Sequence, residues 1–304
     1  MRQPARSRRR QAEPPARAAT RSPAGAAWRR RSPPPVAVAS YAVLAVLFAA
    51  AVLAPVIAPY DIRAQDLPSR LEPPSWLGGA GGHLLGTDHL GRDVLSRLLF
   101  ALRTTLGVAT LGTLIGLALG GALGLAAGLA GGWVDELIMF LVDVQASVPF
   151  ILVALTAIAL VGASQPVLVL VVGLAGWETY ARVVRGQVLA LSGLPFVEAA
   201  RALGASRRRI AVRHLAPAVG TTLAVLATAN FTHVMLLESA LSFLGIGVRP
   251  PGTSLGAMLG ATRDYLLTRW TLPAAPAATI LLLSMAVTVL GDWVRDRLDP
   301  RLRG

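Results

Sequence analysis

Side chains that could carry out catalysis are sparse in this sequence, and most of them stand alone. There are four His and no Cys in 304 residues, which excludes disulfides and thiolate-ligated metals. His83 and His89 share a glycine-rich stretch, but neither has metal-ligand spacing to a further residue, so we predict no metal site and no cofactor. All 29 basic residues are Arg, and without Lys the G-x-x-x-x-G-K-[ST] loop that cradles ATP phosphates is absent. These features predict a chain that is not itself an enzyme.

Five polar residues interrupt long apolar stretches and are the candidates for function. Asp143 and Gln145 lie near the start of one stretch, and Asn230, His233 and Glu238 lie in a later one. Polar side chains are costly in lipid, so they are functional candidates by default. We predict that Asn230, His233 and Glu238 share one helical face and are pore-facing, lining a common cavity. The alternatives place Glu238 at the outer interface and Asp143 at the cytoplasmic one.

The composition indicates lipid, not water, as the solvent of most of the chain. The sequence is 54% hydrophobic with a mean hydropathy of +0.59, and 15% of it is charged, against about 25% in ordinary soluble domains. Six apolar stretches lie at about residues 36–57, 104–128, 137–161, 166–184, 219–244 and 273–290. Roughly 20 helical residues cross a hydrocarbon core of about 30 Å. We therefore predict an all-α membrane protein with six transmembrane helices.

The distribution of arginine predicts the orientation of these spans. The formal net charge is +13, and 21 of the 29 Arg lie in three segments, residues 1–35, 182–213 and 295–303. Six spans place all three segments on one side of the membrane, and the positive-inside rule makes that side the cytoplasm. We therefore predict cytoplasmic termini, a multi-pass protein of the cell inner membrane, and no nucleic-acid partner.

The two ends of the chain differ from the apolar region between them. Residues 1–35 are rich in Arg and Pro and predict a disordered cytoplasmic tail. The run Arg29–Arg31 before an apolar stretch is also compatible with a cleaved export signal, but no small-x-small cleavage site follows, which favours a retained first span. We predict a transmembrane domain over residues 36–293 and a cytoplasmic C-terminal tail over residues 294–304.

Glycine recurs every four or five residues in the second apolar stretch. The positions are Gly107, Gly112, Gly116, Gly120, Gly124 and Gly128. Small residues at this spacing form a groove along one helix face, into which another helix can pack closely. We favour this packing interpretation over a stripe that lines a pore.

The cytoplasmic segment of residues 190–217 predicts a helix–turn–helix. Pro195 suits the first turn of a helix, and Glu198 in that turn complements the helix dipole. Gly204 suits a left-handed helix end, and a second short helix then carries Arg207–Arg209 before Pro217 opens the next span. An idle solvated loop that merely obeys the positive-inside rule would not need Ala199-Ala200 and Gly204 at these positions, so we expect this segment to press against a cytoplasmic partner.

The same segment resembles the EAA motif of ABC-importer permeases, in which Glu-Ala-Ala is followed by three residues and Gly. In that family the segment is the coupling helix that docks onto an ATP-binding subunit. The resemblance implies a coupling role for Glu198, Ala199, Ala200, Gly204, Arg207 and Pro217.

Three further segments narrow the resemblance and extend it over about residues 36–302. Residues 84–97 resemble the G-T-D-x-x-G-R-D signature of the second, C-type permease of dipeptide, oligopeptide and nickel importers, and residues 236–251 and 291–301 resemble the same subunit. The signature residues are Gly86, Thr87, Asp88, Gly91, Arg92 and Asp93. From the residues alone, we expect exposed ion pairs within this loop, and contact with an external solute-binding protein is the alternative.

The resemblance implies an ABC type I importer permease fold and a membrane-spanning subunit that moves peptides or nickel chelates. The implied partners are a second, homologous permease, ATP-binding subunits and an extracytoplasmic solute-binding protein. One alternative is an ion-coupled secondary transporter, but neither an internal repeat nor an ion-coupling network is evident. The other is an intramembrane protease, for which we expect neither a serine-nucleophile elbow nor an H-E-x-x-H pair.

Overall fold

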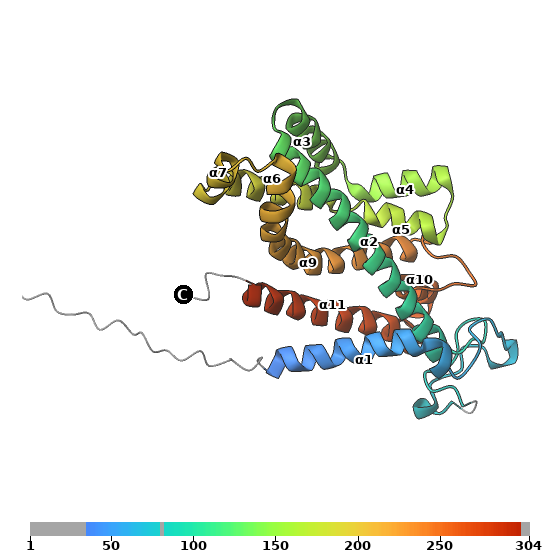
Figure 1. Ribbon diagram of the computed structural model, residues 1–304. Helices are drawn as coiled ribbons and strands as arrows, with labels where there is room; N and C mark the ends of the chain where they lie inside the picture. The colour runs from blue at the N-terminus through green and yellow to red at the C-terminus, as the bar shows by residue number, and fades with distance from the viewer. Residues whose placement is uncertain (1–34, 80–81, 299–304) are drawn as a thin grey trace, which may run out of the picture. The chain divides into compact units, whose positions relative to one another are not determined.

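The computed structural model describes residues 35–79 and 82–298 (Figure 1). The predicted tail of residues 1–35 therefore lies outside the described residues except for Pro35, as do residues 299–304 of the predicted C-terminal tail. Within the described ranges every regular element is a helix. One isolated β-bridge joins Thr87 to Asp93. The prediction of an all-α protein is confirmed.

The described part of the chain contains four long α-helices and seven shorter ones, together with three 3₁₀ turns and one π-helical segment. The long helices are α1 (Pro35–Ile57), α2 (Val94–Ala130), α9 (Ala216–Phe243) and α11 (Thr271–Leu298). The shorter helices are α3 (Gly132–Ser147), α4 (Phe150–Val161), α5 (Gln165–Gly173), α6 (Trp177–Ser192), α7 (Pro195–Ala202), α8 (Arg207–Ile210) and α10 (Leu255–Thr262). α11 continues five residues beyond the predicted domain boundary at residue 293.

Five helical stretches among the described residues are long and apolar enough to cross a membrane, and α3 with α4 makes a sixth if the bent pair counts as one span. The predicted third span, residues 137–161, is therefore not one straight helix, because α3 and α4 meet at 92°. Pro149 disfavours a helical conformation for the residue before it, and Val148 is extended, with φ −104° and ψ 131°. The fourth span is interrupted between α5 and α6, where Gly176 has a φ of +83°.

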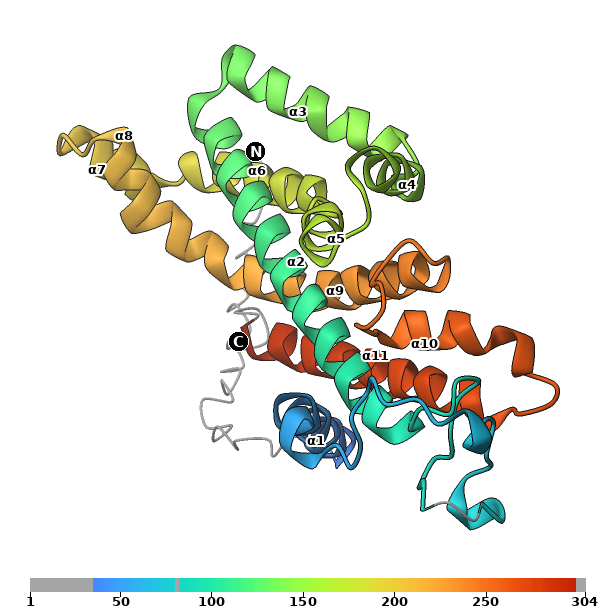
Figure 2. The same ribbon diagram turned by 90° about the vertical axis from the view of Figure 1, so that its right-hand side faces the viewer.

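α2 lies at the centre of the packing and crosses the other long helices (Figure 2). Five of its glycines face the backbone of α5, α6 or the residues between them: Gly112, Gly116, Gly120, Gly124 and Gly128. A Cβ on Gly124 would lie 2.6 Å from Ala181 O, and one on Gly128 would lie 2.7 Å from Val188 Cβ. Gly107, in contrast, faces open space. The packing interpretation of the glycine groove is thus confirmed beyond Gly107.

α1 and α11 lie side by side along one flank of this core (Figure 1). Tyr41 and Trp293 meet edge to face with ring centroids 5.5 Å apart, and the Arg297 guanidinium lies 4.7 Å from the centre of the Trp293 ring. Aromatic and cation–π contacts of this kind stabilise a helix pair beyond the effect of the area that it buries. They join the first and last described helices of the chain.

Candidate functional site

The predicted coupling loop, residues 190–217, folds into two short helices joined by a tight turn. α7 begins at Pro195, whose missing N–H costs nothing in the first helical turn. The turn after it contains Gly204 at a φ of +82°, which glycine adopts without strain. The side chain of Ser206 then caps α8, and five π-helical residues lead into α9. The helix–turn–helix expected from the sequence is present.

Apolar side chains fix the coupling loop to the body of the protein. Val197, Ile210 and Leu215 are at most 2% exposed. They form one buried cluster with residues of α6 and α9: Val184, Val188 and Val219. A movement of α7 would therefore be transmitted to both of these helices, because close-packed interiors deform little.

The opposite side of α7 is open. The predicted coupling residues are all exposed except Ala200, which is half-buried: Glu198, Ala199, Gly204, Arg207 and Pro217. Two apolar residues on the same two-helix unit, Phe196 and Leu203, are 46% and 89% exposed. Exposed apolar side chains beside small ones are typical of a docking surface. Sequence reasoning missed both, although large apolar residues in an otherwise charged loop were a usable signal.

The signature loop, residues 58–93, is compact, and two of its glycines make this possible. Gly86 and Gly91 have φ values of +77° and +72°. A Cβ on Gly86 would collide with Glu72 O, and one on Gly91 would collide with Asp66 O. Only glycine satisfies both the left-handed conformation and the close approach of a second backbone segment.

Asp88 is the centre of a buried ion-pair cluster in this loop. Its Oδ2 accepts a hydrogen bond from Arg92 Nε at 2.8 Å and lies 3.5 Å from Arg97 Nε. Its Oδ1 accepts from the backbone N–H of Leu90 at 2.8 Å. The predicted Asp88–Arg92 pair is therefore present, but the expectation that such pairs are exposed is wrong, since Asp88 is only 5% exposed. The pair was expected to be weak because solvent screens surface charges, and here little solvent reaches it.

Asp93 lies outside that cluster and has a different role in the structure. Its Oδ2 accepts from Ser96 N at 2.7 Å, which caps α2, and its Oδ1 lies 2.9 Å from His83 Nδ1. Thr87 is fully buried and accepts a hydrogen bond from Glu72 N at 2.9 Å. The signature residues thus hold the loop to itself and to α2, and their contact with an external protein stays a prediction.

His89 connects the signature loop to the segment before α11. Its ring stacks on Tyr265 with centroids 6.1 Å apart. Burial lowers the pKa of His89, three nearby arginines lower it further, and the Asp88 carboxylate opposes them. The ring is therefore neutral at neutral pH, which suits a stacking contact.

Replacing Asp93 with Ala should lower the stability of the purified subunit by about 1 kcal/mol, since loss of a helix cap costs roughly 0.5–2 kcal/mol. Thermal unfolding in detergent measures the change. Asp61→Ala is the matched control, because Asp61 is an exposed carboxylate of the same loop whose one hydrogen bond within the described part of the loop comes from Arg63 N. Equal losses for the two variants would contradict the capping role.

The three candidate pore-facing residues do not share a cavity. Glu238 is fully buried, His233 is exposed and Asn230 is half-buried. Five helical residues rotate the chain by about 500°, which leaves about 140° between His233 and Glu238. The prediction of a common face is therefore wrong, and so is the alternative that placed Glu238 at the outer interface. A pore-facing role for Asn230 and His233 individually stays a prediction.

Glu238 instead joins three helices through hydroxyl groups. Its Oε1 accepts from Ser242 Oγ at 2.6 Å, and its Oε2 accepts from Thr105 Oγ1 of α2 at 3.2 Å. Thr105 Oγ1 in turn accepts from Leu255 N, the first residue of α10, at 3.1 Å. Buried polar groups in a low dielectric need such partners. The sequence offered no signal for Thr105 or Ser242.

The run Gly252–Gly256 has the G-x-S-x-G spacing of a nucleophile elbow, which the expectation of no such motif overlooked. Ser254 is fully buried, and its hydroxyl accepts from Ala257 N at the start of α10. Thr253 beside it lies 3.4 Å from an Arg97 amino group. This serine is therefore a helix cap in a buried turn, and a nucleophile would need a hydroxyl that substrate can reach.

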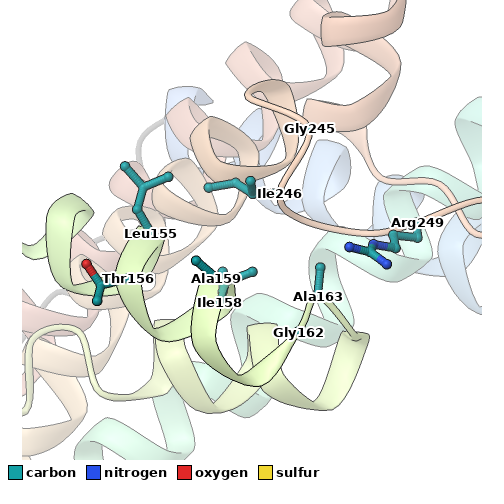
Figure 3. Close-up of a pocket in the computed structure, with 9 residues that line it drawn as sticks. All are labelled: Leu155, Thr156, Ile158, Ala159, Gly162, Ala163, Gly245, Ile246 and Arg249. Carbon is teal, nitrogen blue, oxygen red and sulfur yellow. The ribbon is translucent and has the colours of Figure 1, made fainter.

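A hollow of about 470 Å³ lies between the end of α4 and the segment after α9 (Figure 3). Its lining is Leu155, Thr156, Ile158, Ala159, Gly162, Ala163, Gly245, Ile246 and Arg249. Arg249 is its only charged residue, and it extends toward the α4 side of the hollow (Figure 3). An apolar group with a negative charge would be complementary to this lining.

Comparison with known proteins finds two family models and several relatives that match this chain. Residues 120–304 match the family model of binding-protein-dependent transport system inner membrane components, and residues 22–74 match the N-terminal transmembrane domain of oligopeptide transport permease C. A di/tripeptide transport system permease of Pseudomonas aeruginosa is 36% identical over 86% of each chain. A nickel transport system permease of Escherichia coli is 39% identical over 80% of this chain and 86% of its own.

Two further relatives extend the comparison. A glutathione transport system permease of Pectobacterium atrosepticum is 35% identical over 91% of this chain and 90% of its own. Among solved structures, the MetNI methionine ABC transporter in an inward-facing conformation has the same fold, with a TM-score of 0.53 and 18% identity over 67% of this chain and 96% of that one.

The helices, the loops and these relatives define a multi-pass inner-membrane permease subunit of a bacterial ABC importer. The chain belongs to the family of binding-protein-dependent transport system inner membrane components, in its oligopeptide permease C branch. The predicted family and the importer function are confirmed.

Proposed function

We propose that this subunit forms half of the translocation pathway of an importer for small peptides. The solute class is inferred from the relatives of this chain. They include permeases for di/tripeptides, for dipeptides and for glutathione, which is itself a tripeptide. A nickel permease of similar identity makes nickel chelates the second candidate. The ion-coupled alternative gains no support from these relatives.

ATP is hydrolysed on separate subunits that dock on α7, and this chain is not itself an enzyme. The exposed face of α7, with Glu198 and Ala199, and the 89% exposed Leu203 directly after this helix support this docking surface. The termini lie in the cytoplasm, on the same side as α7. A homologous permease completes the pathway, and a solute-binding protein delivers the peptide at the opposite face.

Uptake into proteoliposomes tests the proposal. The complete importer, with its ATP-binding subunits and solute-binding protein, is expected to accumulate a radiolabelled dipeptide or tripeptide only when ATP is present. Accumulation of a nickel chelate without any peptide would select the second candidate. Uptake driven by a proton or sodium gradient in the absence of ATP would refute the importer mechanism for this chain.

A further inference from the structure

Two of the membrane spans are interrupted, and their interruptions are neighbours. The first lies at Val148–Pro149, where α3 meets α4 at 92°. The second lies at Leu174–Gly176, between α5 and α6. The side chain of Gln145, three residues before the first interruption, donates to Leu174 O in the second at 2.7 Å. Backbone hydrogen bonding is weakest at such interruptions, so helices bend there most readily.

The helices on one side of the interruptions form a tightly connected pair. α3 and α6 share a buried cluster of Val142, Trp177 and Ala181. Asp143 pairs with Arg182 at 3.1 Å. Nearer the other end of the pair, Asp135 forms a bidentate ion pair with Arg185. Arg185 Nε donates to Asp135 Oδ1, and a terminal amino group of Arg185 donates to Asp135 Oδ2. Polar and apolar contacts thus join α3 and α6 along their length.

The helices on the other side form a second pair. α4 and α5 pack through a different buried cluster that also includes residues of α2 and α9: Val108, Ala154, Ile158, Leu168, Val171, Val172, Val234 and Leu241. The two interruptions therefore separate an α3–α6 pair from an α4–α5 pair, and each pair has its own core. α7 follows α6 after only two residues, Gly193 and Leu194, so the α3–α6 pair is the one in direct connection with the coupling loop.

The amide of Gln145 contacts both sides of the second interruption. Its Oε1 accepts from Trp177 Nε1 at 2.6 Å, and its Nε2 lies 3.2 Å from Glu178 Oε2, both in the first turn of α6. Its bond to Leu174 O reaches α5, since Leu174 N still donates to Leu170 O of that helix at 3.0 Å. If α5 and α6 move relative to each other, at least one of these bonds must break.

Gly176 accommodates a third helix at the same place. A Cβ on this residue would lie 2.5 Å from Asn230 Oδ1 of α9, and its φ of +83° suits glycine. The interruption is therefore built into the packing of α3, α5, α6 and α9, and it is more than a local defect of one helix.

We infer that α3 and α6 move as one body about these two interruptions, together with α7, and that Gln145 is the positioning residue that holds the hinge. The inference rests on the proposed transport function, because it describes how docking at α7 reaches the membrane spans. Hinged movement of packed elements is a common basis of such transitions. Gln145 is not a solute ligand in this scheme; it ties the moving pair to the end of α5.

Coupling between ATP hydrolysis and uptake is the first test. In the reconstituted importer, Gln145→Leu should raise the ATP hydrolysed per peptide imported by roughly tenfold, since it removes two good hydrogen bonds from the hinge. Gln145→Glu keeps the acceptor for Trp177 but loses the donor to Leu174 O, and should behave similarly. Gln187→Leu is the matched control, because this amide in α6 donates to Thr222 Oγ1 at 2.6 Å away from both interruptions. A wild-type ratio in both Gln145 variants would overturn the role of Gln145.

Distance measurements test the moving body directly. The chain contains no Cys, so spin labels can be placed on introduced cysteines without background from this subunit. In the complete importer, ATP should change the distance between labels at Glu136→Cys in α3 and Leu160→Cys in α4. The distance between Glu136→Cys and Leu189→Cys in α6 should stay constant. All three positions are exposed.

The outcomes separate the hinge from the transport function. Equal changes in both distances, or a change in neither, would overturn the hinge even if ATP-driven peptide uptake is intact. Absence of ATP-driven uptake in the unmodified importer would refute the proposed function instead, and the two distances would still report whether α3 and α6 move together.

Discussion

Replacing Glu198 with Arg is expected to reduce ATP-driven uptake at least about tenfold, because charge reversal in a docking contact costs several kcal/mol and each 1.4 kcal/mol is a factor of ten. Glu198 is exposed in the first turn of α7. There the new Arg would also oppose the positive end of the helix dipole. The substitution touches no buried residue, so the subunit itself should still insert and fold. Uptake into proteoliposomes and co-purification of the ATP-binding subunits are the two measurements.

A charge reversal elsewhere controls for the altered net charge. Asp292→Arg suits this purpose, because Asp292 is exposed on α11, outside the coupling loop. It should leave uptake close to the wild-type rate. If Glu198→Arg retained both full uptake and the ATP-binding subunits, α7 could not be the docking helix that we propose.

Replacing Gly124 with Leu should destabilise the folded subunit by roughly 3 kcal/mol, the upper part of the usual range for overpacking a core. Its Cβ alone would lie 2.6 Å from Ala181 O and 2.8 Å from Val184 Cβ. The first of these is a backbone atom of α6, so no rotamer change relieves the overlap. Separation of α2 from α6 would also weaken the support of the coupling loop, because Val184 belongs to the cluster that holds α7.

Gly107→Leu in the same helix is the matched control. No atom lies within 4 Å of a Cβ at Gly107, and replacing a helical glycine normally stabilises a helix by about 0.5–1 kcal/mol. Denaturation of both variants in mixed detergent micelles compares them. Equal destabilisation would show that the glycine spacing, and not the contact with α6, determines the effect.

These two predictions concern opposite ends of one path through the molecule. In the mechanism that we propose, α7 receives the ATP-binding subunit, and α6 carries the displacement of α7 along the glycine groove of α2. The groove allows a close approach of the two helix backbones. The hinge that we infer at Gln145 lies where α6 meets the end of α5, so in this mechanism it limits how far the displacement travels.

Local features of the fold were predictable because their causes are local. Apolar length alone located the spans, since a helix needs about 20 residues to cross the lipid. Pro195 and Gly204 predicted the start and end of α7, since each acts through its own backbone. The glycine spacing likewise predicted a packing groove, although it did not say which helix would occupy it.

The tertiary structure alone decided which distant residues meet. Thr105 and Glu238 are 133 positions apart, and their hydrogen bond turns a candidate pore residue into a buried connector of α2 and α9. The signature loop was expected to carry exposed ion pairs, and packing against α2 and the Thr253 turn buried Asp88 and Arg97 instead. The hinge depends on Gln145 reaching Leu174, 29 positions away. A sequence pattern reports the preference of each segment for helix or lipid, but a polar side chain takes its role from the partners that burial places beside it.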